Sequence, residues 1–198
     1  MTDKSVEFFF DFGSPAAYLA YTQLPRIASE SHAELVWRPI LLGGVFQATG
    51  NRSPVEVPAK GVYMINDLMR FATRYGVTHR HNPHFPINTL LLMRGAIGLQ
   101  LHAPDQFQTY VEAVFRAIWV DGRNMNDPAT VGAVLQAAGL DAQKLLALTA
   151  QQDVKDRLKA VTQEAIERGV FGAPTMFVGK QMFWGQDRLD FVREALAA

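Results

Sequence analysis

Residues 5–20, SVEFFFDFGSPAAYLA, carry the strongest fold signal in the chain. Apolar side chains recur at every second position of the first half, at Val6, Phe8, Phe10 and Phe12. Another phenylalanine faces the other way, so the pattern predicts a strand over residues 5–12 that is buried on much of both faces. Gly13, Ser14 and Pro15 follow as a turn glycine, a helix N-cap residue and a proline suited to the first helical turn. A helix is therefore expected to begin here.

The segments that follow complete a strand–helix–strand unit. The expected helix carries one apolar stripe and contains Pro25, which should kink it or shorten its second half. A second strand is expected over residues 35–40. Because strand, helix and strand together span only about 35 residues, the strands should be parallel with a right-handed crossover.

The C-terminal end predicts a helix, a hairpin and a final helix. A helical pattern covers residues 153–168. Two short strands, Thr175–Val178 and Gln181–Trp184, flank a turn at Gly179–Lys180. Asp187 is expected to start the last helix. The order of elements is then βαβ, a helical middle, and αββα.

The middle of the chain predicts one long connection followed by helices. From Gly43 to about Pro58 the sequence is rich in Gly, Pro, Asn and Ser without clear periodicity, which favours an irregular, functional loop. Helical stripes follow as far as Gly139, and Asp127 with Pro128 marks the start of the last of them.

Composition excludes several classes of protein. The 19 Lys and Arg residues balance the 19 Asp and Glu residues over 198 positions, so neither nucleic acid nor an anionic membrane is an expected partner. The sequence lacks both a membrane helix and a signal peptide, so a cytoplasmic location is expected. There is no cysteine, which excludes disulfides, thiolate metal sites and a CxxC redox centre. Any thiol chemistry must use the thiol of a ligand.

Three motifs are candidates for a functional site. Ser14 lies at a helix N-terminus that would stabilise a thiolate or carboxylate, although a simple helix cap explains this motif alone better. Pro174, directly before a strand, suits a sheet edge or a cis peptide bond, and Ala173 beside it could pair with an extended peptide. A plain turn proline explains that motif equally well. Trp184–Asp187 form a second strand-to-helix junction, yet Asp187 is also an ordinary N-cap.

Two other kinds of site fit the sequence poorly. His79, His81 and His84 are clustered but match no zinc-binding spacing, so no metal is expected. No GxSxG motif surrounds Ser14 and no general base is evident beside it, which argues against a serine hydrolase.

Taken together, three motifs resemble those of one family. FDFGSP at residues 10–15, VFGAPTMF at 170–177 and FWGQDRL at 183–189 are similar to motifs of the 2-hydroxychromene-2-carboxylate isomerases. These enzymes belong with the DsbA-like proteins and the kappa-class glutathione transferases. A looser similarity extends through the middle of the chain.

The resemblance implies an α/β protein with a thioredoxin-like fold and a large all-helical insertion. Residues 1–42 and 151–198 would form the thioredoxin-like domain, and residues 43–150 the insertion. The resemblance further implies a homodimer, glutathione as a cofactor that is regenerated in each turnover, and a small aromatic substrate.

Roles for individual residues also follow from the resemblance. Ser14 would contact the glutathione sulfur, and Ala173 before a cis-Pro174 would pair with the backbone of the tripeptide. The remaining polar groups of glutathione would be held by Trp184, Gly185, Gln186 and Asp187. Substrate contacts are expected from Asn51, Arg52 and Asn88.

The expected activity is a glutathione-dependent cis–trans isomerisation, through addition of a thiolate, bond rotation and elimination. The helix N-terminus and a hydrogen bond from Ser14 would lower the pKa of the glutathione thiol. Two alternatives remain open at this point: a kappa-class-like glutathione transferase, and a non-catalytic thioredoxin-like module that binds a peptide. A disulfide oxidoreductase is excluded because the chain has no redox couple.

Overall fold

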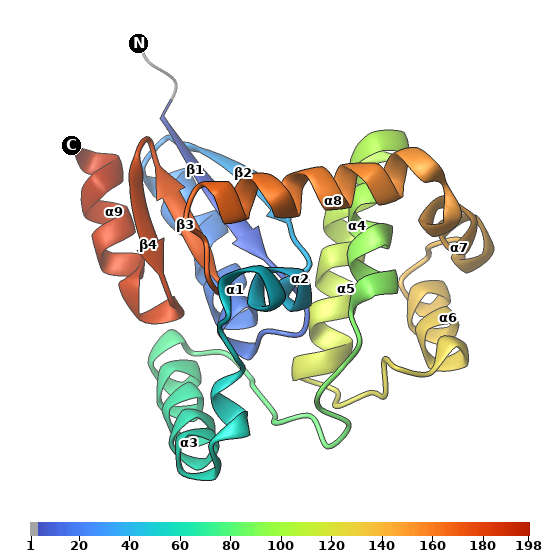
Figure 1. The fold of residues 1–198 in the computed structure, drawn as a ribbon, viewed down its shortest axis with the longest axis horizontal. Helices are drawn as coiled ribbons and strands as arrows, with labels where there is room; N and C mark the ends of the chain where they lie inside the picture. Colours follow the sequence, from blue (N-terminus) through green and yellow to red (C-terminus); the bar gives the residue numbers. More distant parts are fainter. Residues whose placement is uncertain (1–3) are drawn as a thin grey trace.

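The structure, a computed structural model, describes residues 4–198. Its centre is a four-stranded sheet with the strand order β2-β1-β3-β4 (Figure 1). β1 (Ser5–Phe10) pairs in parallel with β2 (Glu34–Pro39) and antiparallel with β3 (Thr175–Val178). β4 (Gln181–Trp184) pairs antiparallel with β3. With α1 (Pro15–Glu30) as the crossover between the parallel strands, this is the thioredoxin-like fold that the sequence predicts.

Most of the helices lie between β2 and β3 in the sequence. They are α2 (Leu42–Thr49), α3 (Pro58–Tyr75), α4 (Leu90–His102), α5 (Phe107–Trp119), α6 (Pro128–Ala137), α7 (Ala142–Ala150) and α8 (Gln152–Glu167). The last helix, α9 (Leu189–Ala197), follows β4. In Figure 1, α4 to α7 form a body beside the sheet, whereas α3 lies below the hairpin of β3 and β4. Within residues 4–198, no helix has both the length and the apolar character needed to span a bilayer.

The alternation of side chains along β1 decides what covers each face of the sheet. Phe10 and Phe12 are fully buried and contact Phe115 of α5, with ring centroids 5.8 and 4.8 Å apart. Phe9 faces the other way, where the guanidinium of Arg168 lies 5.2 Å from the centre of its ring. The predicted two-sided burial of this strand is confirmed, and the strand itself ends at Phe10.

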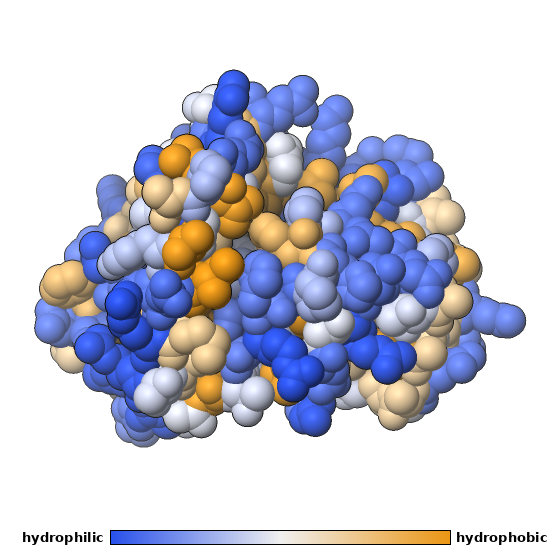
Figure 2. Space-filling view, turned by 90° about the horizontal axis from the view of Figure 1, so that it is seen from below, coloured by the Kyte–Doolittle hydropathy of each residue, from blue (hydrophilic) through white to orange (hydrophobic). Residues whose placement is uncertain are grey.

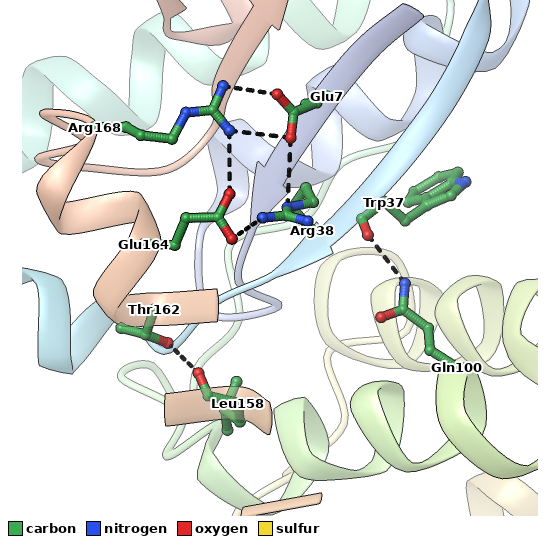
Figure 3. Close-up of polar contacts among 8 residues, drawn as sticks. All are labelled: Glu7, Trp37, Arg38, Gln100, Leu158, Thr162, Glu164 and Arg168. Carbon is green, nitrogen blue, oxygen red and sulfur yellow. Dashed lines mark hydrogen bonds and ion pairs between the residues drawn. The ribbon is translucent and has the colours of Figure 1, made fainter. Parts of the chain in front are cut away.

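A cluster of charged side chains joins α8 to the sheet on the Phe9 side (Figure 3). Glu7 of β1 pairs with Arg168 at 2.7 Å and with Arg38 of β2 at 3.5 Å. Glu164 of α8 pairs with the same two arginines. Because these charges alternate in sign and are partly shielded from solvent, they hold β1, β2 and the end of α8 in one arrangement.

The predicted loop from Gly43 to Pro58 is wrong in its first half. Helix α2 occupies Leu42–Thr49, and only residues beyond it are irregular, apart from a short 3-10 helix at Pro54–Glu56. The N–H of Leu42 donates to a carboxylate oxygen of Asp11, at 2.8 Å. This helix start is stabilised by a residue from a distant part of the sequence, so no local capping residue predicts it.

Two predicted helix boundaries also differ. Helix α1 is not shortened at Pro25 but continues to Glu30, because buried residues on both sides of the proline pack it against the core. The last helix begins at Leu189 rather than at Asp187, since Gln186–Arg188 form a turn of 3-10 helix first.

Candidate active site

Ser14 is the N-cap of α1, directly after the turn that leaves β1. Its Oγ accepts a hydrogen bond from the N–H of Ala17, at 3.1 Å, which is the capping bond expected of a serine at this position. The same hydroxyl donates to the carbonyl oxygen of Ala173, at 2.8 Å. Ser14 therefore caps its helix and also contacts the second candidate motif, 159 positions along the chain.

Ala173 and Pro174 form the approach to β3. The peptide bond between them is cis, as the resemblance implies. The carbonyl oxygen of Pro174 accepts from the N–H of Gly185, at 3.0 Å, and the hydroxyl of Thr175 donates to the carbonyl oxygen of Gly172, at 2.8 Å. The first of these bonds joins the start of β3 to the end of β4, so two of the candidate motifs lie side by side, and the second fixes the turn before β3.

The motif Trp184–Asp187 forms the end of β4 and the turn that follows. The indole ring of Trp184, 47% exposed, lies so close to Gly172 that a Cβ there would be 2.6 Å from its Nε1. Gly185 has a φ of 105°, which side chains other than glycine rarely adopt. The two glycines thus permit a close approach of this tryptophan to the backbone beside Ala173.

The turn after β4 is also joined to α3. The hydroxyl of Tyr75, the last residue of α3, donates to the carbonyl oxygen of Gln186, at 2.5 Å. Burial, reinforced by Asp190 and Asp187, raises the pKa of Tyr75 to about 12, so its phenol keeps this hydrogen at neutral pH. The carboxylate of Asp187 pairs with Arg188 at 2.6 Å.

These motifs line one cavity of about 940 Å³. Its walls come from the N-terminal end of α1, the start of α2, residues 51–56, helix α3, residues 85–89 and both ends of the β3–β4 hairpin. Figure 2 views the molecule from the side of α3 and shows a hollow on this face flanked by apolar residues. A volume of this size is at the upper end of small-molecule sites and has room for two ligands of modest size.

Two of the three residues expected at the substrate lie on the cavity wall. The Nδ2 group of Asn51 donates to the carbonyl oxygen of Phe171, at 2.8 Å, which fixes residues 51–56 beside the cis peptide bond. The guanidinium of Arg52 is exposed and lies 3.9 Å from Glu56. Asn88 is not among the lining residues, and its Oδ1 accepts from the N–H of Leu90 at the start of α4.

Several lining residues did not stand out in the sequence. Lys60, Tyr63, Met64, Asp67 and Leu68 form one stripe of α3 at helical spacing. The spacing of these residues is helical. A stripe that mixes charged and apolar side chains, however, does not indicate that this face of the helix lines a cavity. Asp11 lines the cavity as well, although no pattern in the sequence indicated a role for it beyond its place in the FDFGSP motif.

The electrostatic setting of Ser14 is that of an anion site. It stands at the N-terminus of a 16-residue helix that has no acidic side chain in its first turn. The dipole of such a helix favours a negative charge near its N-terminus. Within residues 4–198, no group of three or more His, Asp or Glu side chains is arranged to hold a metal ion.

Comparisons with known proteins agree with this geometry. A family model described as the DSBA-like thioredoxin domain matches residues 5–197. The chain is 34% identical to the 2-hydroxychromene-2-carboxylate isomerase of Sphingobium xenophagum, with 98% of each chain covered. It is 27% identical to glutathione S-transferase kappa 1 of Homo sapiens, covering 98% of this chain and 91% of the relative.

Solved structures give the same picture. A structure of 2-hydroxychromene-2-carboxylate isomerase superposes with a TM-score of 0.82 at 33% identity, covering 97% of this chain and 94% of the other. A probable DsbA oxidoreductase from Streptomyces coelicolor shares the fold, with a TM-score of 0.72 at 18% identity and coverage of 98% and 88%.

Proposed function

The chain belongs to the DSBA-like thioredoxin domains, in the family of the 2-hydroxychromene-2-carboxylate isomerases, and from this premise we propose that it is a glutathione-dependent isomerase. The reaction would convert 2-hydroxychromene-2-carboxylate, or a related intermediate of aromatic degradation, to trans-o-hydroxybenzylidenepyruvate. One observation carries the proposal. In a chain without cysteine, the Ser14 hydroxyl and the Ala173 carbonyl meet at a helix N-terminus in the wall of a large cavity.

The absence of cysteine decides where the nucleophile comes from. A serine hydroxyl is too weakly acidic to attack unaided and needs an adjacent base. The nearest carboxylate in sequence, Asp11, accepts from the N–H groups of Gly13 and Leu42, and no hydrogen bond joins its side chain to Ser14 among the described residues. Ser14 is therefore better suited to hold a thiolate than to act as a nucleophile.

Bound glutathione would supply that thiolate, which adds to a conjugated carbon of the ring-opened substrate, makes the double bond a rotatable single bond, and leaves again unchanged. The residues at the site fit such a ligand. Ala173 offers its backbone beside Pro174, where an extended peptide can add as a short strand. The turn Trp184–Asp187 supplies an exposed indole ring and further polar groups on the adjoining wall.

Binding and thiolate stabilisation would be coupled through one hydrogen. A serine hydroxyl has a single hydrogen to donate, and that of Ser14 is directed at the carbonyl oxygen of Ala173. A ligand N–H that donates to the same carbonyl oxygen would compete for it. The Ser14 hydroxyl could then turn towards a sulfur at the helix N-terminus without leaving a buried acceptor unpaired.

The remaining volume would take the aromatic substrate. Phe46, Val55 and Tyr63 give the cavity apolar walls on the side of α2 and α3. Asn51 and Arg52 line the same cavity, Asn51 bonds to Phe171 close to the cis peptide bond, and the guanidinium of Arg52 is well suited to a substrate carboxylate. We therefore keep these two residues as the proposed substrate contacts.

A direct assay tests the proposal. Purified protein is mixed with glutathione and 2-hydroxychromene-2-carboxylate, and formation of the trans product is followed by its absorbance. Total free glutathione is measured at the start and the end. The proposal expects product only when glutathione is present, with no net consumption of the thiol. No product at any glutathione concentration would contradict it.

The second candidate is a kappa-class-like glutathione transferase, which the similarity to kappa transferases favours. Such an enzyme would use the same residues but release a conjugate. Loss of free thiol in proportion to product, with a mass increase in the product, would identify it. A non-catalytic peptide-binding module would show neither reaction, and calorimetry would find no affinity for glutathione.

The proposal includes the setting in which the protein works. We propose a homodimer in the cytoplasm, where the glutathione pool keeps thiols reduced and so provides the cofactor in its reactive form. Analytical ultracentrifugation would test the dimer, and a single species of 22.0 kDa at micromolar concentration would contradict it.

A further inference from the structure

Asp11 is a buried carboxylate that the proposed reaction leaves without a role. It lies between β1 and the turn that leads to Ser14, and its side chain is only 1% exposed. One oxygen, Oδ1, accepts from the N–H of Gly13 at 2.8 Å, and the other, Oδ2, accepts from the N–H of Leu42 at 2.8 Å. The hydroxyl of Thr89 lies near enough to lower the pKa of this carboxyl.

These three groups, two donors and a nearby hydroxyl, come from three separate walls of the cavity. Gly13 belongs to the turn before α1, Leu42 is the first residue of α2, and Thr89 is the N-cap of α4. All three line the cavity together with Asp11. In addition, the N–H of Ser14 donates to the backbone oxygen of Asp11, at 3.0 Å. A single residue thus holds the Ser14 turn from both its side chain and its backbone.

The chemistry of this position calls for a carboxylate. Burial raises the pKa of Asp11 above its ordinary value, and the hydrogen bonds from Leu42 and Gly13, with the Thr89 hydroxyl, offset only part of this rise. Among the described residues no cationic side chain pairs with it, so its charge is balanced by N–H and O–H donors alone. Burying an acceptor of this kind lowers the stability of the fold unless each of its donors is in place. The positions of the three walls therefore depend on one another.

We infer that Asp11 is a positioning residue, which holds Ser14, the start of α2 and Thr89 in one fixed geometry around the sulfur of the bound thiol. The inference rests on the proposed glutathione site. Asp11 acts through Gly13 and Ser14, and it has no need to contact the substrate.

Asp11→Asn is the direct test. Asparagine has the same shape but only one accepting oxygen, so its NH₂ group would face one of the backbone N–H groups. We expect kcat for the isomerisation to fall roughly 10- to 100-fold, the scale of a small misplacement of a reacting group. We also expect a higher pKa for the bound glutathione thiol, followed by thiolate absorbance, because the Ser14 hydroxyl would be less well placed.

The chain offers a closely matched control. Asp127, the N-cap of α6, also accepts from two backbone N–H groups and a threonine hydroxyl: those of Ala129 and Thr130, at 3.3 and 3.1 Å, and Thr130 Oγ1, at 2.7 Å. It does not line the cavity. Asp127→Asn should therefore loosen a helix start in the same way while kcat and the thiol pKa stay at their original values.

A second variant tests the contribution of the Thr89 hydroxyl. Thr89→Val removes the hydroxyl that reaches Asp11 and keeps the shape of the side chain. It should shift the thiol pKa in the same direction as Asp11→Asn but by less, since the two backbone donors remain. The other ionisable groups that line the cavity are unchanged in both variants; they are Arg52, Glu56, Lys60, Tyr63, Asp67 and Asp187.

Peptide-level hydrogen exchange gives a readout that needs no glutathione. In Asp11→Asn, exchange should rise at least several-fold in peptides that cover residues 9–17 and 41–49, and in Asp127→Asn only around α6. An unchanged rate in both cavity peptides would overturn the inference even if the protein proves not to use glutathione. A downward shift of the thiol pKa would also overturn it, because Asp11 would then act through its charge. If wild type itself neither binds glutathione nor isomerises, the proposed function fails, and hydrogen exchange alone decides the role of Asp11.

Discussion

At the scale of single residues, Ser14 combines an observed role as a helix cap with a proposed role as a thiolate contact, and the two make different demands on its hydroxyl. As an N-cap it must accept from the N–H of Ala17, and as a thiolate contact it must donate its one hydrogen. Both are compatible because Oγ has lone pairs to accept with while its hydrogen is used elsewhere. The sequence alone favoured the cap, and the structure adds the bond to Ala173, which no local pattern could reveal.

Replacing Ser14 should separate these roles. In Ser14→Ala we expect the bound thiol to ionise at higher pH and kcat to fall roughly 10- to 100-fold at neutral pH, the worth of one hydrogen bond to a charged group. Loss of the cap should lower the free energy of unfolding by about 1 kcal/mol. A pH titration of thiolate absorbance and urea denaturation measure the two effects. Ser14→Thr, which keeps the hydroxyl, is the control; an unchanged titration in Ser14→Ala would contradict the role.

His79 is a buried imidazole that the sequence singled out only as a doubtful metal ligand. Its side chain is 7% exposed and stacks on Trp119, with ring centroids 5.8 Å apart and an interplanar angle of 11°. Burial, with a smaller contribution from His81, lowers the pKa of His79 to about 4. The ring is therefore neutral in the folded protein at physiological pH.

This shift predicts a pH dependence of stability. In the unfolded chain His79 becomes protonated below about pH 6.5, whereas in the folded chain it becomes protonated only near pH 4. Stability contributed by the neutral ring is thus complete above pH 6.5 and is lost as the pH falls towards 4, by on the order of 2 kcal/mol. Urea denaturation of wild type and His79→Phe at pH 7 and pH 4.5 isolates this part. Equal losses in the two proteins would contradict the prediction.

At the scale of elements, the sequence predicted best where the signal is local. The β3–β4 hairpin has the predicted boundaries, because its turn at Gly179–Lys180 and the short apolar strands beside it are sufficient. Helix α2 was missed for the opposite reason. Two glycines near its start weaken its intrinsic helix propensity, and the N–H of its first residue, Leu42, donates to a side chain 31 positions earlier. Such stabilisation is a property of the folded chain.

Helix α3, one wall of the cavity, buries few residues for its length. Only Gly61, Leu68 and Ala72 are buried along its 18 residues. At its C-terminal end, the hydroxyl of Tyr75 bonds to the carbonyl oxygen of Gln186 in the proposed glutathione site. The position of α3 is therefore sensitive to this one bond.

Tyr75→Phe should make the position of α3 less well fixed while leaving no cavity in the core. Loss of one hydrogen bond to a half-buried carbonyl is worth about 1 kcal/mol, so we expect the Kd for glutathione to rise roughly fivefold. Calorimetry measures the affinity, and hydrogen exchange should increase along α3. Tyr63→Phe is the control, because the Tyr63 hydroxyl makes no hydrogen bond within residues 4–198. An equal effect in both variants would contradict a specific link through Tyr75.

At the scale of the whole molecule, the candidate site is assembled from nearly the full length of the chain. The motifs at 10–15 and 170–187 could be identified from the sequence, because each contains specific turn residues at the end of a strand. The stripe on α3 and the placement of Asn88 outside the cavity depend on how the helices pack between β2 and β3, which local patterns do not encode. We propose that residues 43–150 form one insertion, which supplies the cavity walls that face the thioredoxin-like domain.

This assembly predicts that glutathione stabilises the whole fold. A site built from distant segments does not exist in the unfolded chain, so a ligand binds only the folded state. At one hundred times its Kd, such a ligand adds about 2.7 kcal/mol to the free energy of unfolding. For a chain of this length the unfolding midpoint should rise by roughly 5 to 10 °C.

Differential scanning fluorimetry over a range of glutathione concentrations tests this prediction, with an equimolar mixture of glutamate, cysteine and glycine as the control. The free amino acids supply the same groups without the peptide backbone that Ala173 is proposed to bind, so they should leave the midpoint unchanged. S-methylglutathione keeps the backbone but cannot form a thiolate, so it should stabilise the fold and support no isomerisation. A midpoint that glutathione fails to move would remove the basis for placing the tripeptide between Ser14 and Trp184.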